Sequence, residues 1–233
     1  MTINNNLMTY QKELGIFFDE LSFRKNLFVQ FKKQADKYLA SDFNIFNVID
    51  PDEPKLSDIL ANILNTNGYH GQGIIFLEEF VNFISERGLE VPFVIYDVHR
   101  EVSANGRIDL LLESDSFAII IENKPFAQDL EDQLNRYYEA MKQKHGEDVA
   151  VVYLNKNRKL PQNFSSKLKK RQLTNLLNKN KLLVISYLEL KDYLTICYQK
   201  CDSNKFRYFL SDFIDYIIKK FPIIEGVDND SDE

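Results

Sequence analysis

Residues 107–124 read RIDLLLESDSFAIIIENK, and this stretch decides the fold. The runs of Leu, Ile and Phe at 107–113 and 117–123 predict two strands, because such residues fill buried positions of a sheet. The polar SDS at 114–116 favours a tight turn between them. The stretch therefore predicts a β-hairpin at the centre of the chain.

The pattern on either side predicts further strands and helices. A period of two marks a strand at 91–99, closed by the turn SANG, and apolar runs mark strands at 149–154 and 182–186. Helical spacing of apolar residues predicts one long or two consecutive helices within 10–40 and further helices at 56–66, 74–88, 128–146, 187–201 and 205–220. This order predicts an α/β fold with a central mixed sheet covered by helices on both faces.

No repeat and no Ser/Gly/Pro-rich linker divides the sequence. We therefore expect one domain over residues 1–225, followed by an acidic, disordered tail at 226–233. Within that domain we expect a helical N-terminal extension, a core, a basic insert, and a C-terminal strand with helices, at 1–48, 50–155, 156–181 and 182–225 respectively.

Composition excludes several classes of protein. With 44% hydrophobic residues and only 8 Gly and 6 Pro, the sequence is neither collagen-like nor mostly disordered. It has no long apolar run and no signal-peptide pattern, so we expect a cytoplasmic protein without a membrane partner. Cys197 and Cys201 are too few for a disulfide framework or a zinc site and predict buried free thiols. A homo-oligomer is compatible with the sequence, but we read no oligomeric state from it.

The distribution of charge matters more than the net charge of −6. Residues 155–181 contain Lys and Arg but no Asp or Glu, which indicates a surface that faces phosphates. The alternative is a solvated loop and helix whose charges serve solubility. Our candidates for contact with nucleic acid are Arg107, Lys167, Lys169, Lys170 and Arg171. Arg107 is as well explained by a structural pair with Glu101 or Glu113.

The hairpin places three ionisable side chains together. If the turn is centred on 115–116, Asp109 lies opposite Glu122, and Lys124 shares the face of Glu122. Two carboxylates about 5 Å apart repel by about 3 kcal/mol at an effective dielectric near 20. Mg²⁺ or Mn²⁺ would reverse the sign of that cost. With Lys124 holding or deprotonating a water, the set predicts hydrolysis of a phosphodiester.

The triplet Glu-x-Lys alone is weak evidence, since it also occurs at 53–55 and 189–191. Only 122–124 ends an apolar strand and has an acid on the neighbouring strand. The competing interpretation of this site is an ion-pair cluster at a strand end, in which Arg107 and Lys124 neutralise the acids.

Asp109 followed by Glu122-Asn123-Lys124 resembles the catalytic core of the PD-(D/E)XK nuclease superfamily, although Ile108 stands where the motif has Pro. Gln133 and Tyr137 resemble the Gln-x-x-x-Tyr signature of one branch, and their spacing of four places them on one helical face. The segment LSDILANILNTNGYHGQGIIFLEEF is similar to the helical lead-in of a bacterial family of this superfamily. The resemblance covers roughly 50–155.

The resemblance implies a metal site formed by Asp109, Glu122 and the backbone carbonyl of Asn123, with Lys124 on the nucleophilic water. It implies that Gln133 and Tyr137 orient the site or touch the substrate. A glutamate from a preceding helix often completes such sites, and Glu53 is our first candidate and Glu79 the second. Each is also explained as a surface acid.

We therefore expect a restriction-endonuclease-like α/β fold and a nuclease that depends on Mg²⁺ or Mn²⁺ and acts on DNA. The first alternative is a catalytically silent module of the same fold that binds nucleic acid or protein. The second is a structural or toxin-neutralising partner that uses the aromatic helical segment near the N-terminus. The Phe-rich face of residues 17–31 fits a core or a partner-helix surface better than a base-stacking platform. His70 fits a turn residue better than a phosphate ligand.

Overall fold

The computed structural model describes residues 2–126 and 130–222, with side chains from residue 10 onward. The chain divides into two compact units, 1–44 and 45–233, which we describe separately. The acidic tail expected at 226–233 lies outside the described residues.

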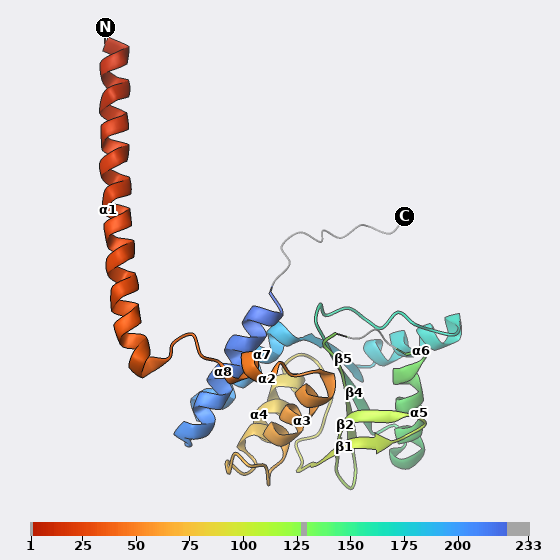
Figure 1. The fold of residues 1–233 in the computed structure, drawn as a ribbon. Helices are drawn as coiled ribbons and strands as arrows, with labels where there is room; N and C mark the ends of the chain where they lie inside the picture. Colours follow the sequence, from red (N-terminus) through yellow and green to blue (C-terminus); the bar gives the residue numbers. More distant parts are fainter. Residues whose placement is uncertain (1, 127–129, 223–233) are drawn as a thin grey trace. The chain divides into compact units, whose positions relative to one another are not determined.

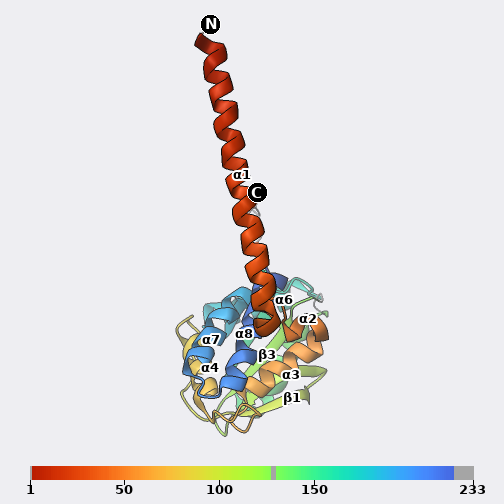
Figure 2. The same cartoon turned by 60° about the vertical axis from the view of Figure 1, so that its left-hand side comes forward.

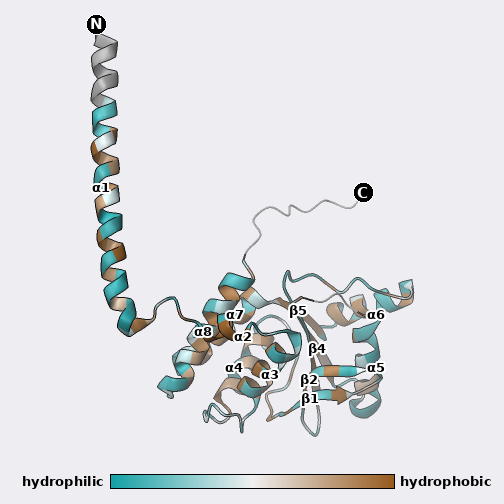
Figure 3. Ribbon diagram, viewed as in Figure 1, coloured by the Kyte–Doolittle hydropathy of each residue, from teal (hydrophilic) through white to brown (hydrophobic). Residues whose placement is uncertain are grey.

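The first unit consists mainly of helix α1 (Thr2–Leu39). The expected one or two helices are therefore a single continuous helix of 38 residues. Its large apolar side chains are exposed, for example Phe17 at 59% and Phe28 at 68%. In Figure 3, hydrophobic and hydrophilic residues alternate along α1. Of the two interpretations of the Phe-rich face, a partner-helix surface thus fits better than a core.

The second unit is built on a five-stranded sheet (Figure 1). Its strands are β1 (Asp97–Ser103), β2 (Arg107–Glu113), β3 (Ala118–Lys124), β4 (Val149–Asn155) and β5 (Leu182–Ser186), in that spatial order. The first three strands run antiparallel, and β3, β4 and β5 run parallel. The prediction of a central mixed sheet is confirmed.

Helices cover both faces of the sheet, as predicted, because both faces of the central strands are apolar. Ile119 and Ile121 of β3 pack into one core, and Ala118 and Ile120 pack into the other. The first core is covered by α2 (Ile45–Ile49), α3 (Glu53–Leu64), α4 (Ile75–Ser85), α7 (Tyr187–Lys200) and α8 (Asn204–Lys220). The second is covered by α5 (Gln133–His145) and α6 (Lys167–Asn178). Figure 2 brings the larger helical layer to the front.

Capping residues fix where several of these helices begin. Asp52 accepts a hydrogen bond from the Lys55 amide at the start of α3, and Ser203 accepts one from the Phe206 amide at the start of α8. At α7, Ser186 and Glu189 form a reciprocal capping box. The capped first turn of α3 carries Glu53, the first candidate for a further acid of the site.

The boundaries of β1 and α3 are among those that differ from the predictions. Strand β1 begins at Asp97 rather than 91, since Pro92 has no amide for a sheet and its carbonyl accepts a hydrogen bond from Tyr96 Oη at 2.9 Å. Helix α3 begins at Glu53 rather than 56, and the basic insert contains α6, which starts after the capping residue Ser166. Part of the helix expected from 128 lies outside the described residues.

Cys197 and Cys201 are buried and free, as predicted. No helix among the described residues is long and apolar enough to cross a membrane.

Candidate active site

The site lies at the open end of the β2–β3 hairpin. The two strands pair with Leu110 opposite Ile121, which is the register predicted from the turn. Beyond that pair, Asp109 Oδ2 accepts a hydrogen bond from the backbone amide of Asn123 at 3.0 Å. The Asp109 carboxylate therefore replaces a ladder hydrogen bond and is fixed beside the end of β3.

Lys124 lies among three carboxylates. Its Nζ is 2.9 Å from Glu122 Oε1, 2.8 Å from Glu53 Oε1 and 4.0 Å from Asp109 Oδ2. The side chains of Glu122 and Lys124 are only 1% and 9% exposed. Three acids and one amine thus share a buried cluster, in which negative charge is in excess.

Asn123 joins the end of β3 to two helices on the other face of the sheet. Its Nδ2 donates to Ser57 Oγ of α3 at 2.8 Å, and its Oδ1 accepts from Tyr187 Oη of α7 at 2.7 Å. Ser57 in turn donates to the Glu53 carbonyl at 3.0 Å. These contacts hold the first turn of α3 against β3 and so bring Glu53 to Lys124.

Arg100 of β1 fastens the same turn of α3 to β2. Its guanidinium donates to the Asp109 carbonyl, to the Pro54 carbonyl at 3.2 Å and to Asp58 Oδ1 at 3.0 Å. Hydrogen bonds from one planar guanidinium to three groups restrict their relative motion. Arg100 therefore helps to set the position of Asp109 relative to Glu53.

Gln133 and Tyr137 of α5 hold the cluster from the other side. Gln133 Nε2 donates to Glu122 Oε1 at 2.7 Å and to Tyr137 Oη at 3.0 Å. Tyr137 Oη donates to the Arg107 carbonyl at 2.8 Å and accepts from the Arg107 amide at 3.2 Å. A side chain at Gly106 would meet the Tyr137 ring, since a Cβ there would lie 2.8 Å from Cε1. Glycine at 106 thus makes room for the ring.

Burial dominates the electrostatics of the cluster. Removal from water, followed by the charge of Asp109, raises the pKa of Glu122 to about 8, despite the opposing effect of Lys124. Burial lowers the pKa of Lys124, but the carboxylates of Glu122 and Glu53 outweigh it and hold that pKa above its ordinary value. The ammonium is therefore charged and supplies the positive charge that the acids share.

The oxygens of the cluster suit a hard divalent cation. Glu53 Oε2 and Glu122 Oε2 are buried and accept no hydrogen bond from the described residues. Buried carboxylate oxygens without partners are costly unless a cation satisfies them. Among the described residues, no three acidic, histidine or cysteine side chains already surround one point as metal ligands. The carboxylate oxygens are suitable ligands for Mg²⁺ or Mn²⁺. In this structure the ammonium of Lys124 lies at the point where the three acids converge.

An open cleft of about 670 Å³ begins at Lys124. Basic side chains (Lys156 and Lys159), amides (Asn155, Asn157, Gln162 and Asn163) and the rings of Phe126 and Tyr153 line it. Basic side chains and hydrogen-bond donors bind the phosphate backbone of nucleic acids, and aromatic rings beside them stack on the nucleobases. The cleft leads from the basic insert to the cluster.

Other predicted site residues lie elsewhere. Glu79 pairs with Lys200 of α7, so Glu53 and not Glu79 lies beside Lys124. The Arg107 side chain pairs with Glu101, with Nη1 at 3.4 Å from Oε1. Helix α6 carries Lys167, Lys169, Lys170 and Arg171, and none of these four lines the cleft in the described part of the chain.

His70 is buried, and its side chain stabilises the turn in which it lies. Its Nδ1 accepts from the Gln72 amide at 2.9 Å, and its ring packs against Phe76 and Phe206. This arrangement matches the structural interpretation of the residue.

Sequence reasoning missed the residues that position the site. Ser57 carried a signal, since it lies one turn after Glu53 on the same helical face. Arg100 and Tyr187 carried none, because their roles depend on how β1 and α7 pack. Lys156 and Lys159 were counted in the basic segment but not chosen as candidates.

Comparison with known proteins agrees with this geometry. The family model of the PD-(D/E)XK nuclease superfamily matches residues 43–215, which include the whole sheet and the acidic cluster. No curated protein and no solved structure matches the chain. The match covers well over half of the 233 residues, and the chain belongs to the PD-(D/E)XK nuclease superfamily.

Proposed function

We propose that the protein is a nuclease that depends on Mg²⁺ or Mn²⁺ and hydrolyses phosphodiester bonds in DNA. One observation carries the proposal: Asp109, Glu53 and Glu122 converge on Lys124 at the mouth of a basic cleft. A cluster built only for stability would balance its charges, because an excess of buried negative charge destabilises the fold.

The metal ligands in this proposal are Asp109, Glu122 and the backbone carbonyl of Asn123, with Glu53 as a further acid. A bound divalent ion supplies a Lewis acid that polarises the phosphate and stabilises the leaving oxygen. The two partnerless oxygens, Glu53 Oε2 and Glu122 Oε2, support the assignment. Gln133 would keep Glu122 in position through its 2.7 Å hydrogen bond.

Lys124 would act on the attacking water. Its ammonium can donate a hydrogen bond to the water oxygen and orient it toward phosphorus, and its charge stabilises negative charge that develops in the transition state. Lys156 and Lys159 would hold the phosphates of the strand that lies in the cleft. Lys167, Lys169, Lys170, Arg171 and Arg107 remain candidates for more distant phosphate contacts.

The test is cleavage of labelled duplex DNA, single-stranded DNA and RNA with Mg²⁺, Mn²⁺ or EDTA. We expect metal-dependent cleavage of DNA and a loss of about 10²–10³-fold in Lys124→Met, the scale of removing one electrostatic donor. Lys144→Met is the matched control, since Lys144 is a distant surface lysine that pairs with Glu113. Circular dichroism shows whether each variant is folded.

Two outcomes would overturn the proposal. Cleavage by Lys124→Met at the wild-type rate would remove Lys124 from the mechanism. Retardation of DNA without cleavage under any metal condition would favour the catalytically silent module. Thermal unfolding adds a readout besides activity: Mg²⁺ at about 100 times its Kd should stabilise wild type by about 2.7 kcal/mol. Glu122→Gln should lose most of that gain.

A further inference from the structure

Helix α1 of the first unit carries a mainly apolar seam on a surface that the proposed nuclease site does not use. The seam consists of residues spaced alternately four and three apart: Tyr10, Leu14, Phe17, Leu21, Arg24, Phe28, Phe31, Ala35 and Tyr38. We propose that this seam binds a second copy of the chain as a two-stranded coiled coil.

The spacing is that of the a and d positions of a heptad repeat. Alternation of four and three keeps one face of a helix directed at a partner helix, and it persists here for about four heptads. Only Arg24 interrupts the seam with a charge and only Ala35 with a small side chain. A regular repeat of this length is typical of coiled coils rather than of single surface helices.

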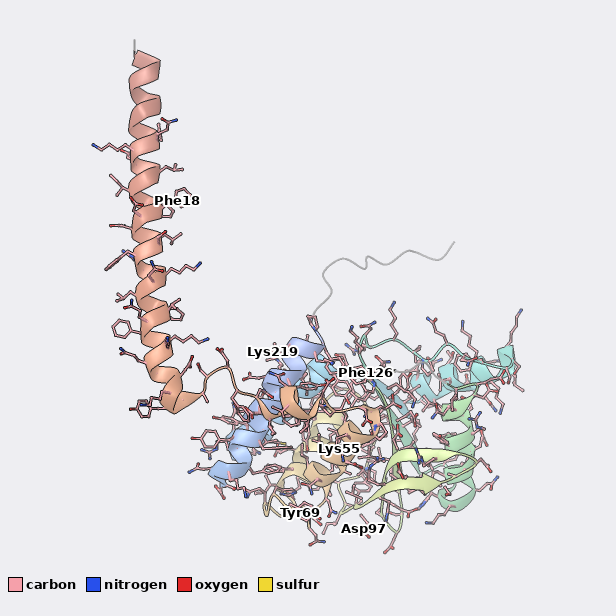
Figure 4. The ribbon with its side chains drawn as sticks, in the orientation of Figure 1. Phe18, Lys55, Tyr69, Asp97, Phe126 and Lys219 are labelled. Atoms are coloured by element: carbon pink, nitrogen blue, oxygen red, sulfur yellow. The ribbon has the colours of Figure 1, made fainter. Side chains whose placement is uncertain are left out.

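The seam side chains are exposed. Tyr10, Phe28 and Tyr38 are 68%, 68% and 82% accessible, and Leu21 is 52% accessible. From residue 10 onward, side chains project outward from α1, and Figure 4 labels Phe18, the residue that follows Phe17 of the seam. Isolated helices are marginal in water and gain most of their stability from packing an apolar face. A helix of 38 residues with such a seam therefore needs a partner.

Several features favour the same helix of another copy as that partner. A heptad seam is self-complementary, because its knobs fit the holes formed by an equal repeat. In a parallel pair, Glu20 beside the seam faces Lys25 of the partner helix, at the positions where opposite charges select partners. The helix spans about 57 Å at 1.5 Å per residue, long enough for four heptads.

Arg24 is consistent with this arrangement. It follows Glu20 by four residues, so the two can pair on the surface of their own helix. A single polar residue in a coiled-coil seam lowers stability but fixes register. The opposite face carries polar residues, namely Lys12, Asp19, Asn26 and Lys33.

The test is the mass of the full chain in solution, measured by light scattering after size exclusion at tens of micromolar. We expect wild type at twice the 27.4 kDa chain mass. Phe28→Glu, in the seam, should shift the mass to one chain. Phe23→Glu is the matched control, because Phe23 is 67% exposed and lies off the seam, and it should leave the dimer intact.

A second pair guards against a folding defect in one variant. Leu21→Asp should also give a single chain, while Ile16→Asp, equally exposed at 54% but off the seam, should not. A wild-type mass of 27.4 kDa would overturn the proposal and leave the catalytic unit or another protein as the occupant of the seam. Equal effects of the seam and off-seam variants would overturn it as well. Neither result depends on nuclease activity.

Discussion

Each end of the β2–β3 hairpin holds a glutamate, and the two environments shift the carboxyl pKa in opposite directions. Near the turn, Glu113 Oε1 accepts from Lys144 Nζ and lies 2.7 Å from His145 Nε2. At the open end, Glu122 is more deeply buried and shares Lys124 with Asp109 and Glu53. Burial taken alone would raise the pKa of both carboxyls. At Glu113 the hydrogen bonds from Lys144 and His145 outweigh burial and lower the pKa, whereas at Glu122 the pKa rises to about 8.

The difference separates a carboxylate paired with basic groups from one to which the proposed function assigns a role in chemistry. Glu113 has two basic partners and access to solvent, so the fold gains from it. Glu122 is buried beside other acids, and Lys124 offsets part of their repulsion. In the proposed function, a bound divalent cation would offset the rest. We expect the two ends to respond differently to the same substitution.

The largest difference in stability should follow loss of the lysine at each end. Lys124→Met leaves buried carboxylates without their cation and should lower the free energy of unfolding by about 3–5 kcal/mol. Lys144→Met removes a lysine that is 61% exposed and should cost less than about 1 kcal/mol. Denaturant unfolding in EDTA measures both. Equal losses of unfolding free energy in the two variants would mean that Lys124 and Lys144 stabilise their ends of the hairpin to the same extent.

A smaller effect should show that the open end is held by hydrogen bonds. Tyr137→Phe removes the hydroxyl that bonds the Arg107 carbonyl, the Arg107 amide and Gln133 Nε2, and it should cost about 1–3 kcal/mol. Tyr138→Phe is the control, since the Tyr138 hydroxyl has no hydrogen bond to the described residues, and it should stay within about 0.5 kcal/mol. Urea denaturation of the two variants makes the comparison. A Tyr137→Phe variant as stable as Tyr138→Phe would contradict the proposed positioning role.

The smallest effect should be the pH dependence at the turn end. The pKa of Glu113 is lowered in the folded state, so its contribution is present above the unfolded value near 4.5 and is lost as pH falls below it. Glu113→Gln should therefore be less stable than wild type by about 1 kcal/mol or less at pH 7, and the difference should shrink toward pH 3. Unfolding curves at both pH values check this. If the difference in unfolding free energy between wild type and Glu113→Gln were the same at both pH values, the ion pairs of Glu113 would not be its cause.

The hairpin and its register were predictable because the information is local. The polar turn at 114–116 and the period of the strands predict Asp109 opposite Glu122, and the pairs that β2 and β3 form, up to Leu110–Ile121, have that register. The expected start of the first strand at 91 was wrong, because β1 begins at Asp97 and apolar residues such as Phe93 and Ile95 are exposed beside Pro92. Periodicity cannot tell a buried strand from an exposed apolar segment.

The rest of the site could not be read from the sequence, because it depends on packing between distant elements. Glu53 and Glu79 are equivalent as residues on helices, and only the docking of α3 on β3 through Ser57 and Asn123 separates them. The seam of α1 has the same ambiguity. Apolar residues at helical spacing predict a buried face in either case, and the structure shows only that no other part of the first unit covers these side chains.

The most direct measurement pairs stability with cleavage in Glu122→Gln, which replaces the buried, titratable carboxyl with a neutral amide of the same shape and keeps the hydrogen bond from Gln133. In EDTA we predict a free energy of unfolding equal to or above that of wild type, and with Mg²⁺ we predict cleavage at least about 100-fold slower. A variant that is less stable than wild type and cuts DNA at the wild-type rate would contradict a cluster kept for metal-dependent chemistry.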